Sequence, residues 1–455
     1  MNSMLTLGEA AEQIRTRQLS PLELTRECLA RIERLNPALN AFITVTAELA
    51  LEQARQAETE IMASHWRGPL HGIPVGLKDL LDTAGVRTTA ASNQFRDRVP
   101  TQDAVLVRQL KQAGAVLVGK LNLHEFAFGG SGIVSAFGPV KNPWDLQRIT
   151  GGSSSGSAAA VVAGLCVAAI GTDTAGSIRC PAAFCGIVGH RPSAGLLSCT
   201  GVVPLSTSFD TPGPMTRTVR DAALLLGALV ADAGSSAPND WAALDDSVAE
   251  LRVGVARKNF FFDVQPEVAA CVEEAIAVIR TLVAQVADVE LEAGGHRSIF
   301  NAEIYEYHEA MVTKTPELYQ PHTLPRILKC AGISASDYIR DWRILNDERT
   351  RAEGLFQQVD VVITPTLPVA APQISELQSL AINDLRQFET RYLLRNTSPF
   401  SVLYWPSVSV PCGFQEEGLP VGLQISGKPG ADATVLRLAH AYEQATQWHK
   451  RVPSE

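Results

Sequence analysis

Two serine-containing turns lie close together in the sequence, GGSSSGS at 151–157 and TDTAGSIRCP at 172–181. Mixed glycine and serine usually form a flexible linker. These two turns instead flank AAAVVAGLCVAAI at 158–170, an apolar segment that belongs in a protein core. A serine hydroxyl attacks a carbonyl carbon only when a nearby group takes its proton. The pattern therefore raises the question of why these serines are placed around a core segment, and a catalytic serine would need a base supplied from elsewhere in the chain.

The familiar motifs of glycine-rich loops and serine hydrolases do not fit these turns. A phosphate-binding loop needs GxxxxGK followed by Ser or Thr, and a dinucleotide-binding turn needs GxGxxG; residues 151–157 contain neither. The hydrolase motif GxSxG requires a second glycine that TAGSIR lacks. His124, His190 and His308 are available as bases, but their spacing singles out none of them.

Lysine remains as a base, and Lys78 is the best candidate. It follows apolar, strand-like residues in GIPVGLKDLL, with no other lysine or arginine between Arg67 and Arg87. Burial disfavours the charged ammonium and would leave the amine free to accept a proton. The alternative is a surface lysine paired with Asp79 or Asp82. The pattern alone leaves both interpretations open.

The segments around these residues alternate between helix and strand patterns. Helices are predicted over 5–63, one of them capped by Ser20 with Pro21 in its first turn. GIPVGLK, a helix over 101–114 and AVLVGK then follow as strand, helix and strand. Strands starting near 251, 360, 408 and 421 accompany helices over 266–286, 336–358 and 431–448. This alternation predicts an α/β fold.

Composition narrows the functional class. The 455 residues include 39 Lys and Arg against 48 Asp and Glu, a net charge of −9. Nucleic-acid backbones are bound by clustered basic residues, so direct nucleic-acid binding is not expected. The cysteines are scattered without a CxxC pair, the N-terminus is charged, and the apolar segment at 158–170 is too short to span a bilayer. These features predict a soluble cytoplasmic protein with no membrane association, no metal site and no cofactor.

The two turns together resemble the signature of the amidase signature family of amidohydrolases. The similarity extends to LHGIPVGLKD, VGKLNLHEFAFGGSG, FCGIVGHRPS, DTPGPMTRTVRDAALLL, DVVITPT, PSVSVPCGF and GLPVGLQISG, and it is weakest over 287–400. The resemblance implies one α/β/α domain over 1–455, with a large mixed sheet covered by helices on both faces. Its expected parts are N-terminal helices over about 1–65, a signature core over about 66–230 and a variable, substrate-shaping region over about 287–400.

The resemblance also implies a role for each residue of the signature. Ser177 would be the nucleophile, Ser153 would follow a cis peptide bond and relay the proton, and Lys78 would be the buried base. The implied oxyanion hole is formed by the backbone amides of Thr174, Ala175 and Gly176, and the implied supporting residues are Ser154, Ser155, Asp173 and Arg179. Asp173 and Arg179 flank the turn before Ser177 and are expected to pair across it. Ala175 stands where many members have glycine, which a negative φ tolerates. Cys180 is interpreted as a small buried apolar residue.

Two amide-cleaving functions are consistent with this family. One is a free-standing amidase acting on a small-molecule amide, and the other is the glutaminase (A) component of a glutamine-dependent tRNA amidotransferase. That component holds glutamine with an arginine and an acid, and the matching positions fall near Leu345, with Arg343 and Arg349 close by, and near Leu394. Because the acid is missing, a free-standing amidase is favoured.

The substrate pocket is expected to have an apolar or aromatic wall. The residues predicted to line it are Phe126, Phe128, Gly129, Ser131, Tyr404 and Trp405. The expected partner is the amide substrate, and a homodimer is compatible with the sequence.

Overall fold

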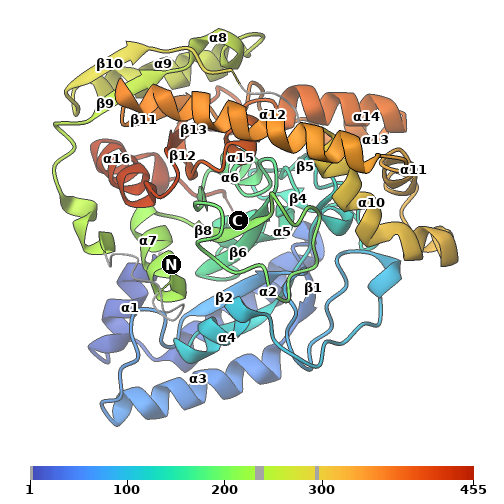
Figure 1. Ribbon diagram of the computed structural model, residues 1–455. Helices are drawn as coiled ribbons and strands as arrows, with labels where there is room; N and C mark the ends of the chain where they lie inside the picture. Colours follow the sequence, from blue (N-terminus) through green and yellow to red (C-terminus); the bar gives the residue numbers. More distant parts are fainter. Residues whose placement is uncertain (1–3, 231–239, 293–296, 455) are drawn as a thin grey trace.

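The computed structural model describes residues 4–230, 240–292 and 297–454 (Figure 1). One sheet of eleven strands runs through the chain in the order β1-β3-β2-β6-β8-β7-β12-β13-β11-β9-β10. Its strands are β1 (Phe42–Val45), β2 (Pro74–Lys78), β3 (Val116–Leu121), β6 (Ala168–Asp173), β7 (Val188–Arg191), β8 (Thr211–Thr216), β9 (Arg252–Val255), β10 (Gln285–Asp288), β11 (Val361–Pro365), β12 (Ser407–Phe414) and β13 (Pro420–Gly427). A separate pair consists of β4 (Lys141–Asn142) and β5 (Asp145–Ile149).

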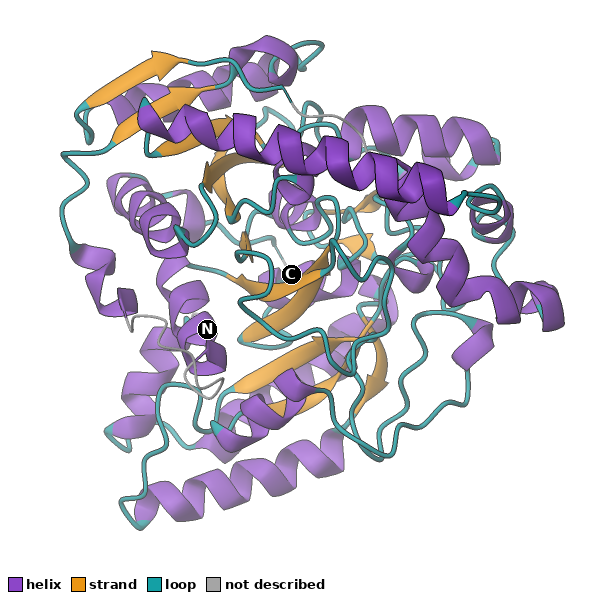
Figure 2. Cartoon of the chain, in the orientation of Figure 1, coloured by secondary structure: helices purple, strands orange, loops and turns teal. Residues whose placement is uncertain are grey.

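Helices cover the sheet on both faces (Figure 2). They are α1 (Leu7–Arg15), α2 (Pro21–Leu39), α3 (Ala47–Met62), α4 (Val105–Gln112), α5 (Ser155–Val162), α6 (Arg179–Cys185), α7 (Val219–Val230), α8 (Arg257–Phe260), α9 (Pro266–Arg280), α10 (Arg297–Lys314), α11 (Leu324–Leu328), α12 (Ala335–Glu353), α13 (Ile374–Gln378), α14 (Ile382–Phe388), α15 (Ser398–Val402) and α16 (Asp432–Ala445). Across the described ranges, no helix combines the length and apolar character needed to cross a bilayer.

The sheet separates two apolar layers because alternate side chains of a strand point to opposite faces. On β3, Leu117 joins the layer formed with α1, α4, α7, α9 and α16, whereas Val116 and Val118 join the layer formed with α2, α3, α5 and α6. The sheet is mixed: β2 is parallel to β3 and β6, β9 is parallel to β10 and β11, and the other pairs are antiparallel. The expected α/β fold with a large mixed sheet is confirmed.

The predicted element boundaries need three corrections. The N-terminal helices are interrupted by β1, a short edge strand. The helix expected over 266–286 ends at Arg280, and 285–288 form β10 at the opposite edge. The helix expected over 336–358 gives way to a 3-10 turn over Gly354–Gln357. The edge strands β1 and β10 are only four residues long, too short for alternation to be visible in sequence. The interior strands β7 and β8 were not predicted either.

The parallel pair β2 and β6 places the two halves of the signature together. β2 ends at Lys78 and β6 ends at Asp173, and Leu77 is paired with Ile170. Since parallel neighbours end at the same edge of a sheet, the residues that follow both strands meet there, as at the ligand sites of other α/β proteins. The buried apolar segment between the two serine turns forms most of α5 and the start of β6, and α5 packs on β6, β2, β3 and β8.

A glycine-to-alanine pair tests how tightly the signature is packed against β3. A Cβ at Gly156, in α5, would lie 2.4 Å from the Ala41 carbonyl oxygen and 2.6 Å from the Asn122 backbone nitrogen and oxygen. These are backbone atoms that cannot rotate away, and overpacking costs about 1–3 kcal/mol. We therefore expect Gly156→Ala to lower the thermal unfolding temperature by several degrees. In Gly354→Ala, the matched control, the new methyl group meets nothing within 4 Å, and an unchanged Gly156→Ala protein would contradict the packing.

Candidate active site

Lys78 lies in a closed, polar environment at the end of β2. Its Nζ is 2.7 Å from Ser153 Oγ and 2.8 Å from Thr172 Oγ1, and the side chain is fully buried. The alternative of a surface lysine paired with Asp79 or Asp82 is therefore wrong. Those carboxylates face other cations, since Lys120 Nζ lies 3.4 Å from Asp79 and Arg98 donates to Asp82 at 2.6 Å.

Burial lowers the pKa of Lys78 to about 7, although Asp210 and Asp173 act in the opposite direction. An ammonium with an ordinary pKa would stay protonated at neutral pH and could not act as a base. With a pKa near 7, a substantial fraction of the amine is neutral and can accept a proton from the adjacent Ser153 hydroxyl. The geometry and the electrostatics together make Lys78 chemically competent as a base.

Ser153 and Ser177 are joined through the start of α5. The Gly152–Ser153 peptide bond is cis. The backbone N–H of Ser154 donates to the Ser177 carbonyl oxygen at 3.2 Å, which holds the second turn against the first. Ser177 is 5% exposed, whereas Ser153 is fully buried beside Lys78. Ser153 therefore lies inside the protein beside Lys78, and Ser177 lies at the wall of the pocket.

The turn before Ser177 is shaped by contact with the segment leading into α15. Gly176 has a φ of +139°, and a Cβ there would lie 2.1 Å from Thr397 Oγ1, so only glycine fits. The Thr397 hydroxyl donates to the Ala175 carbonyl at 2.7 Å. Ala175 is not among the residues with positive φ, so alanine is tolerated there.

The backbone amides of this turn differ from the expectation at one position. The Gly176 N–H, expected in the oxyanion hole, donates to Asp173 Oδ1 at 2.8 Å. Within the described residues, the N–H groups of Thr174, Ala175 and Ser177 make no hydrogen bond. These three amides are the donors available to an oxyanion beside Ser177.

Asp173 is the anchor of the turn. Arg179 donates to both of its carboxylate oxygens at 2.9 Å, as the sequence predicted, and Arg191 Nη1 lies 3.5 Å from Oδ1. Although burial alone would raise the pKa of Asp173, the two guanidinium groups lower it well below its usual value. The carboxylate therefore stays ionised, and its charge is balanced inside the protein.

The side chains of the remaining expected supporting residues, Ser154 and Ser155, hydrogen-bond the backbone and not Ser177. Ser154 Oγ donates to the Thr172 carbonyl at 3.2 Å, and Ser155 Oγ donates to the Asn122 carbonyl at 3.5 Å. Cys180 is buried, and burial raises the pKa of its thiol to about 12, so the thiol stays protonated. Two residues that sequence reasoning missed are Thr172, which holds Lys78, and Arg191, which helps to balance Asp173. Both lie in family-like blocks that could have pointed to them.

None of the three histidines competes with Lys78. The ring of His190 bonds Asp432 at 3.1 Å, and that of His308 bonds Tyr319 at 2.8 Å. His124 lies closer to the site, but its Nδ1 accepts from the Gly132 N–H at 3.3 Å, and burial lowers its pKa to about 4. Among the described residues, no histidine ring is hydrogen-bonded to Ser153 or Ser177.

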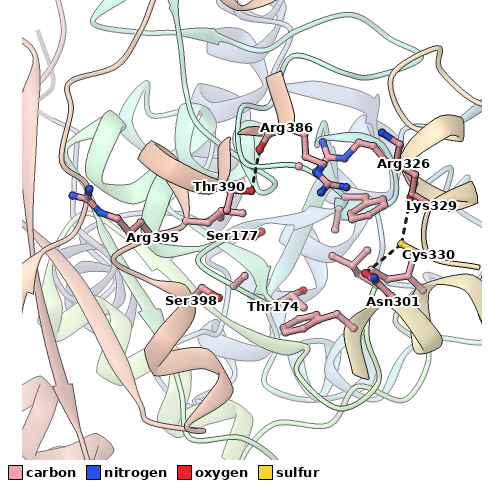
Figure 3. A pocket seen from close by; sticks show the side chains of 18 of the residues that line it. Thr174, Ser177, Asn301, Arg326, Lys329, Cys330, Arg386, Thr390, Arg395 and Ser398 are labelled. Atoms are coloured by element: carbon pink, nitrogen blue, oxygen red, sulfur yellow. Dashed lines mark hydrogen bonds between the residues drawn. The ribbon is translucent and has the colours of Figure 1, made fainter. Parts of the chain in front are cut away.

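A pocket of about 610 Å³ opens over Ser177 (Figure 3). Its lining residues are Ala127, Phe128, Gly129, Thr174, Ala175, Ser177, Leu205, Phe300, Asn301, Ile304, Arg326, Lys329, Cys330, Arg386, Thr390, Leu394, Arg395, Ser398 and Pro399. Apart from the signature turn and the 127–129 loop, most of these come from 300–399, which is the region where family resemblance is weakest.

Four residues expected to line the pocket lie elsewhere. Phe126 packs edge-on against Phe95 and His308, and Trp405 is buried against Phe356 and Phe400. Two others serve as supports: Ser131 donates to Glu389, and the Tyr404 hydroxyl donates to the Ser208 carbonyl. Of the predicted set, Phe128 and Gly129 reach the pocket. Large aromatic side chains are more often buried in the core than placed on a pocket wall, and Phe126 and Trp405 are examples.

Of the positions compared with the glutaminase component, one lines the pocket and the others lie outside it. Leu394 lines the pocket, so the position expected to carry an acid faces the substrate space with an apolar side chain. Leu345 is fully buried, and Arg349 stacks on Tyr404 and donates to the Val402 carbonyl. Neither they nor Arg343 are among the lining residues.

Comparisons with known proteins agree on the family. The Amidase family profile matches residues 23–436. The chain is 37% identical to the A component of the glutamyl-tRNA(Gln) amidotransferase of Moorella thermoacetica, over 99% of this chain and 98% of the relative. This relative has the alternative function and not the favoured one.

Solved structures give a broader range of activities. The vestigial protein complex that reveals the origins of an s-triazine catabolic enzyme has a TM-score of 0.88 at 32% identity, covering 97% of this chain and 99% of that one. The peptide amidase of Stenotrophomonas maltophilia has a TM-score of 0.84 at 31% identity, covering 97% of each chain. With the family profile spanning most of its length, the chain belongs to the amidase family of enzymes that act on C–N bonds.

Proposed function

We propose that the chain hydrolyses a small-molecule amide through an acyl-Ser177 intermediate. The observation that carries the proposal is the buried Lys78 amine, 2.7 Å from Ser153 Oγ, beneath a pocket that exposes Ser177. The eight cysteines are free thiols, which supports a reducing compartment such as the cytoplasm as the place of action.

In the proposed reaction, neutral Lys78 takes the proton of Ser153 while Ser153 takes that of Ser177. Ser177 Oγ then bonds to the amide carbonyl carbon, and the resulting oxyanion accepts hydrogen bonds from the free N–H groups of Thr174, Ala175 and Ser177. The proton returns through Ser153 to the leaving nitrogen as the C–N bond breaks. Water then hydrolyses the acyl ester by the same proton path, which releases the acid and restores Ser177.

A second candidate is the glutaminase component of an amidotransferase, because the sequence relatives favour it. The chemistry of the pocket favours an amide other than free glutamine. A bound glutamine would need a partner for its ammonium group, and the described residues lining the pocket include no aspartate or glutamate. Leaving that ammonium unpaired in a partly buried site is unfavourable.

Assaying the purified chain alone separates these functions. We expect turnover of simple primary amides at rates above that of glutamine, measured as ammonia release. Robust glutamine hydrolysis with inert simple amides, or glutamine hydrolysis that appears only with a co-purified protein, would assign the glutaminase function instead.

Covalent labelling tests the nucleophile. A fluorophosphonate should modify the wild-type chain, and Ser177→Ala should abolish the adduct because Ser177 is the signature serine that lines the pocket. Ser379→Ala, which removes an exposed serine outside the pocket, should label like the wild type. An adduct mapped by mass spectrometry to another side chain would disprove the assignment.

The pH dependence tests the base. Since the neutral amine is the active form and the pKa of Lys78 lies at about 7, kcat/KM should fall as the pH decreases through 7 and level off above it. Lys78→Ala should reduce kcat by about 10²–10⁴-fold at neutral pH, the range of general-base contributions. Lys428→Ala, at an exposed lysine, is the control. Retention of activity in Lys78→Ala would exclude this mechanism.

A further inference from the structure

The pocket over Ser177 has an unusual charge balance. Its lining includes Arg326, Lys329, Arg386 and Arg395, and no carboxylate among the described residues. The chain as a whole has a net charge of −9, so this concentration of positive charge is not a consequence of overall composition. Cations gathered in a concave site raise the local concentration of anions and favour their binding.

Arg326, in the middle of α11, is held in a fixed position by two contacts. Its guanidinium donates to Glu389 Oε2 at 2.7 Å and lies 4.6 Å from the centre of the Phe128 ring. Glu389 is fully buried, also accepts from Ser131, and does not line the pocket. The carboxylate therefore supports Arg326 from behind and leaves the face toward the pocket without an acid.

Lys329 and Arg386 add positive charge without compensation. Lys329 Nζ donates to the neutral side chain of Asn383, which links the end of α11 to α14. Within the described ranges, neither Lys329 nor Arg386 forms an ion pair with a carboxylate. Figure 3 shows Arg326, Lys329 and Arg386 on one side of Ser177, with Arg395 on the other. We call these three residues, Arg326, Lys329 and Arg386, the α11–α14 cluster.

Arg395 does not belong to this cluster. Its guanidinium donates to the Phe262 carbonyl at 2.6 Å and to Asn396 Oδ1 at 3.2 Å, so two of its five N–H groups are bound by neutral acceptors away from the cluster. Cys330 and Asn301, which line the pocket beside the cluster, bond to each other at 3.5 Å. Burial raises the pKa of the Cys330 thiol to about 11, so it adds no negative charge at neutral pH.

We infer that the substrate is an anionic amide, one that carries a carboxylate on its acyl part, and that the α11–α14 cluster binds this carboxylate while Ser177 attacks the amide. The inference rests on the proposed function. Arginine is suited to carboxylates because its planar donors match the two oxygens. The same cluster would repel an ammonium group, which disfavours both cationic amides and the α-ammonium of glutamine.

A series of amides with the same five-carbon chain isolates the charge. Glutaramate carries a carboxylate, pentanamide is neutral, 5-aminopentanamide is cationic, and glutamine is glutaramate with an added ammonium group. We expect kcat/KM for glutaramate to exceed that for pentanamide by about 10–100-fold, the range of a hydrogen bond to a charged group, and that for 5-aminopentanamide to be lowest. Glutamine should fall below glutaramate. Succinamate and adipamate, one carbon shorter and longer, cover the reach to the cluster.

Variants connect the preference to the cluster. Arg386→Gln should reduce the glutaramate-to-pentanamide ratio of kcat/KM by about 10-fold, and Arg386→Glu should shift the preference toward 5-aminopentanamide. Arg391→Gln is the matched control. Arg391 lies five residues further on, outside the pocket, and is exposed and paired with Asp263, so its variant should retain the wild-type ratio.

The outcomes separate this inference from the proposed function. Turnover of amides with no preference for the anionic member at any of the three chain lengths would overturn the inference and leave the proposed function standing. If no amide is cleaved, the proposed function fails, and calorimetry on Ser177→Ala decides the inference. Binding of glutarate more tightly than 1,5-diaminopentane would sustain the cluster as an anion site, and equal or weaker binding would overturn it.

Discussion

The site depends on Lys78 having a neutral amine although two carboxylates nearby favour its protonated form. Burial drives the pKa of Lys78 down, while Asp173 and Asp210 act against that effect. Asp173 is balanced by Arg179 and Arg191. Burial raises the pKa of Asp210, and its oxygens are occupied by the Thr174 hydroxyl at 2.5 Å and by the amide of Leu205 at 2.8 Å. Each carboxylate is thus engaged by its own donors, so that neither forms an ion pair with the amine.

This balance gives a physical reason for the length of the signature. The proposed nucleophile, its proposed base and the arginines that balance Asp173 come from the ends of β2, β6 and β7 and from the start of α6. Arg179 also donates to the Thr397 carbonyl at 3.0 Å and to Gln424 at 2.7 Å, which connects the turn to α15 and β13. A change in any of these blocks would disturb the charge around Lys78, so the chemistry requires residues spread over most of the chain.

The sheet and the signature residues around Lys78 are predicted well from the sequence, and the residues that line the pocket are predicted poorly. The mixed α/β sheet and the Asp173–Arg179 pair follow from periodicity and from signature residues whose types are dictated by chemistry. The short edge strands β1 and β10 were missed, since four residues give too little pattern. Phe126 and Trp405 were placed in the pocket because aromatic residues lie near the signature, but their direction depends on packing against Phe95 and Phe356. Arg326 and Arg386 could not be brought together from sequence because α11 and α14 are separated by the long helix α12 and the strand β11.

The sequence relatives favour a glutaminase component, whereas the pocket residues favour a different amide. The two differ because overall identity and substrate choice depend on different residues. The identity to the amidotransferase relative is an average over nearly the whole chain, and the family profile likewise matches most of its length. Substrate choice depends on a few side chains that line the pocket, such as Leu394 and Arg386, and they contribute little to overall identity. Leucine in place of an acid removes a partner for ammonium, and guanidinium groups facing the pocket add a partner for carboxylate. Both features make the pocket better suited to an anion than to a zwitterion, and neither involves Lys78 or Ser153.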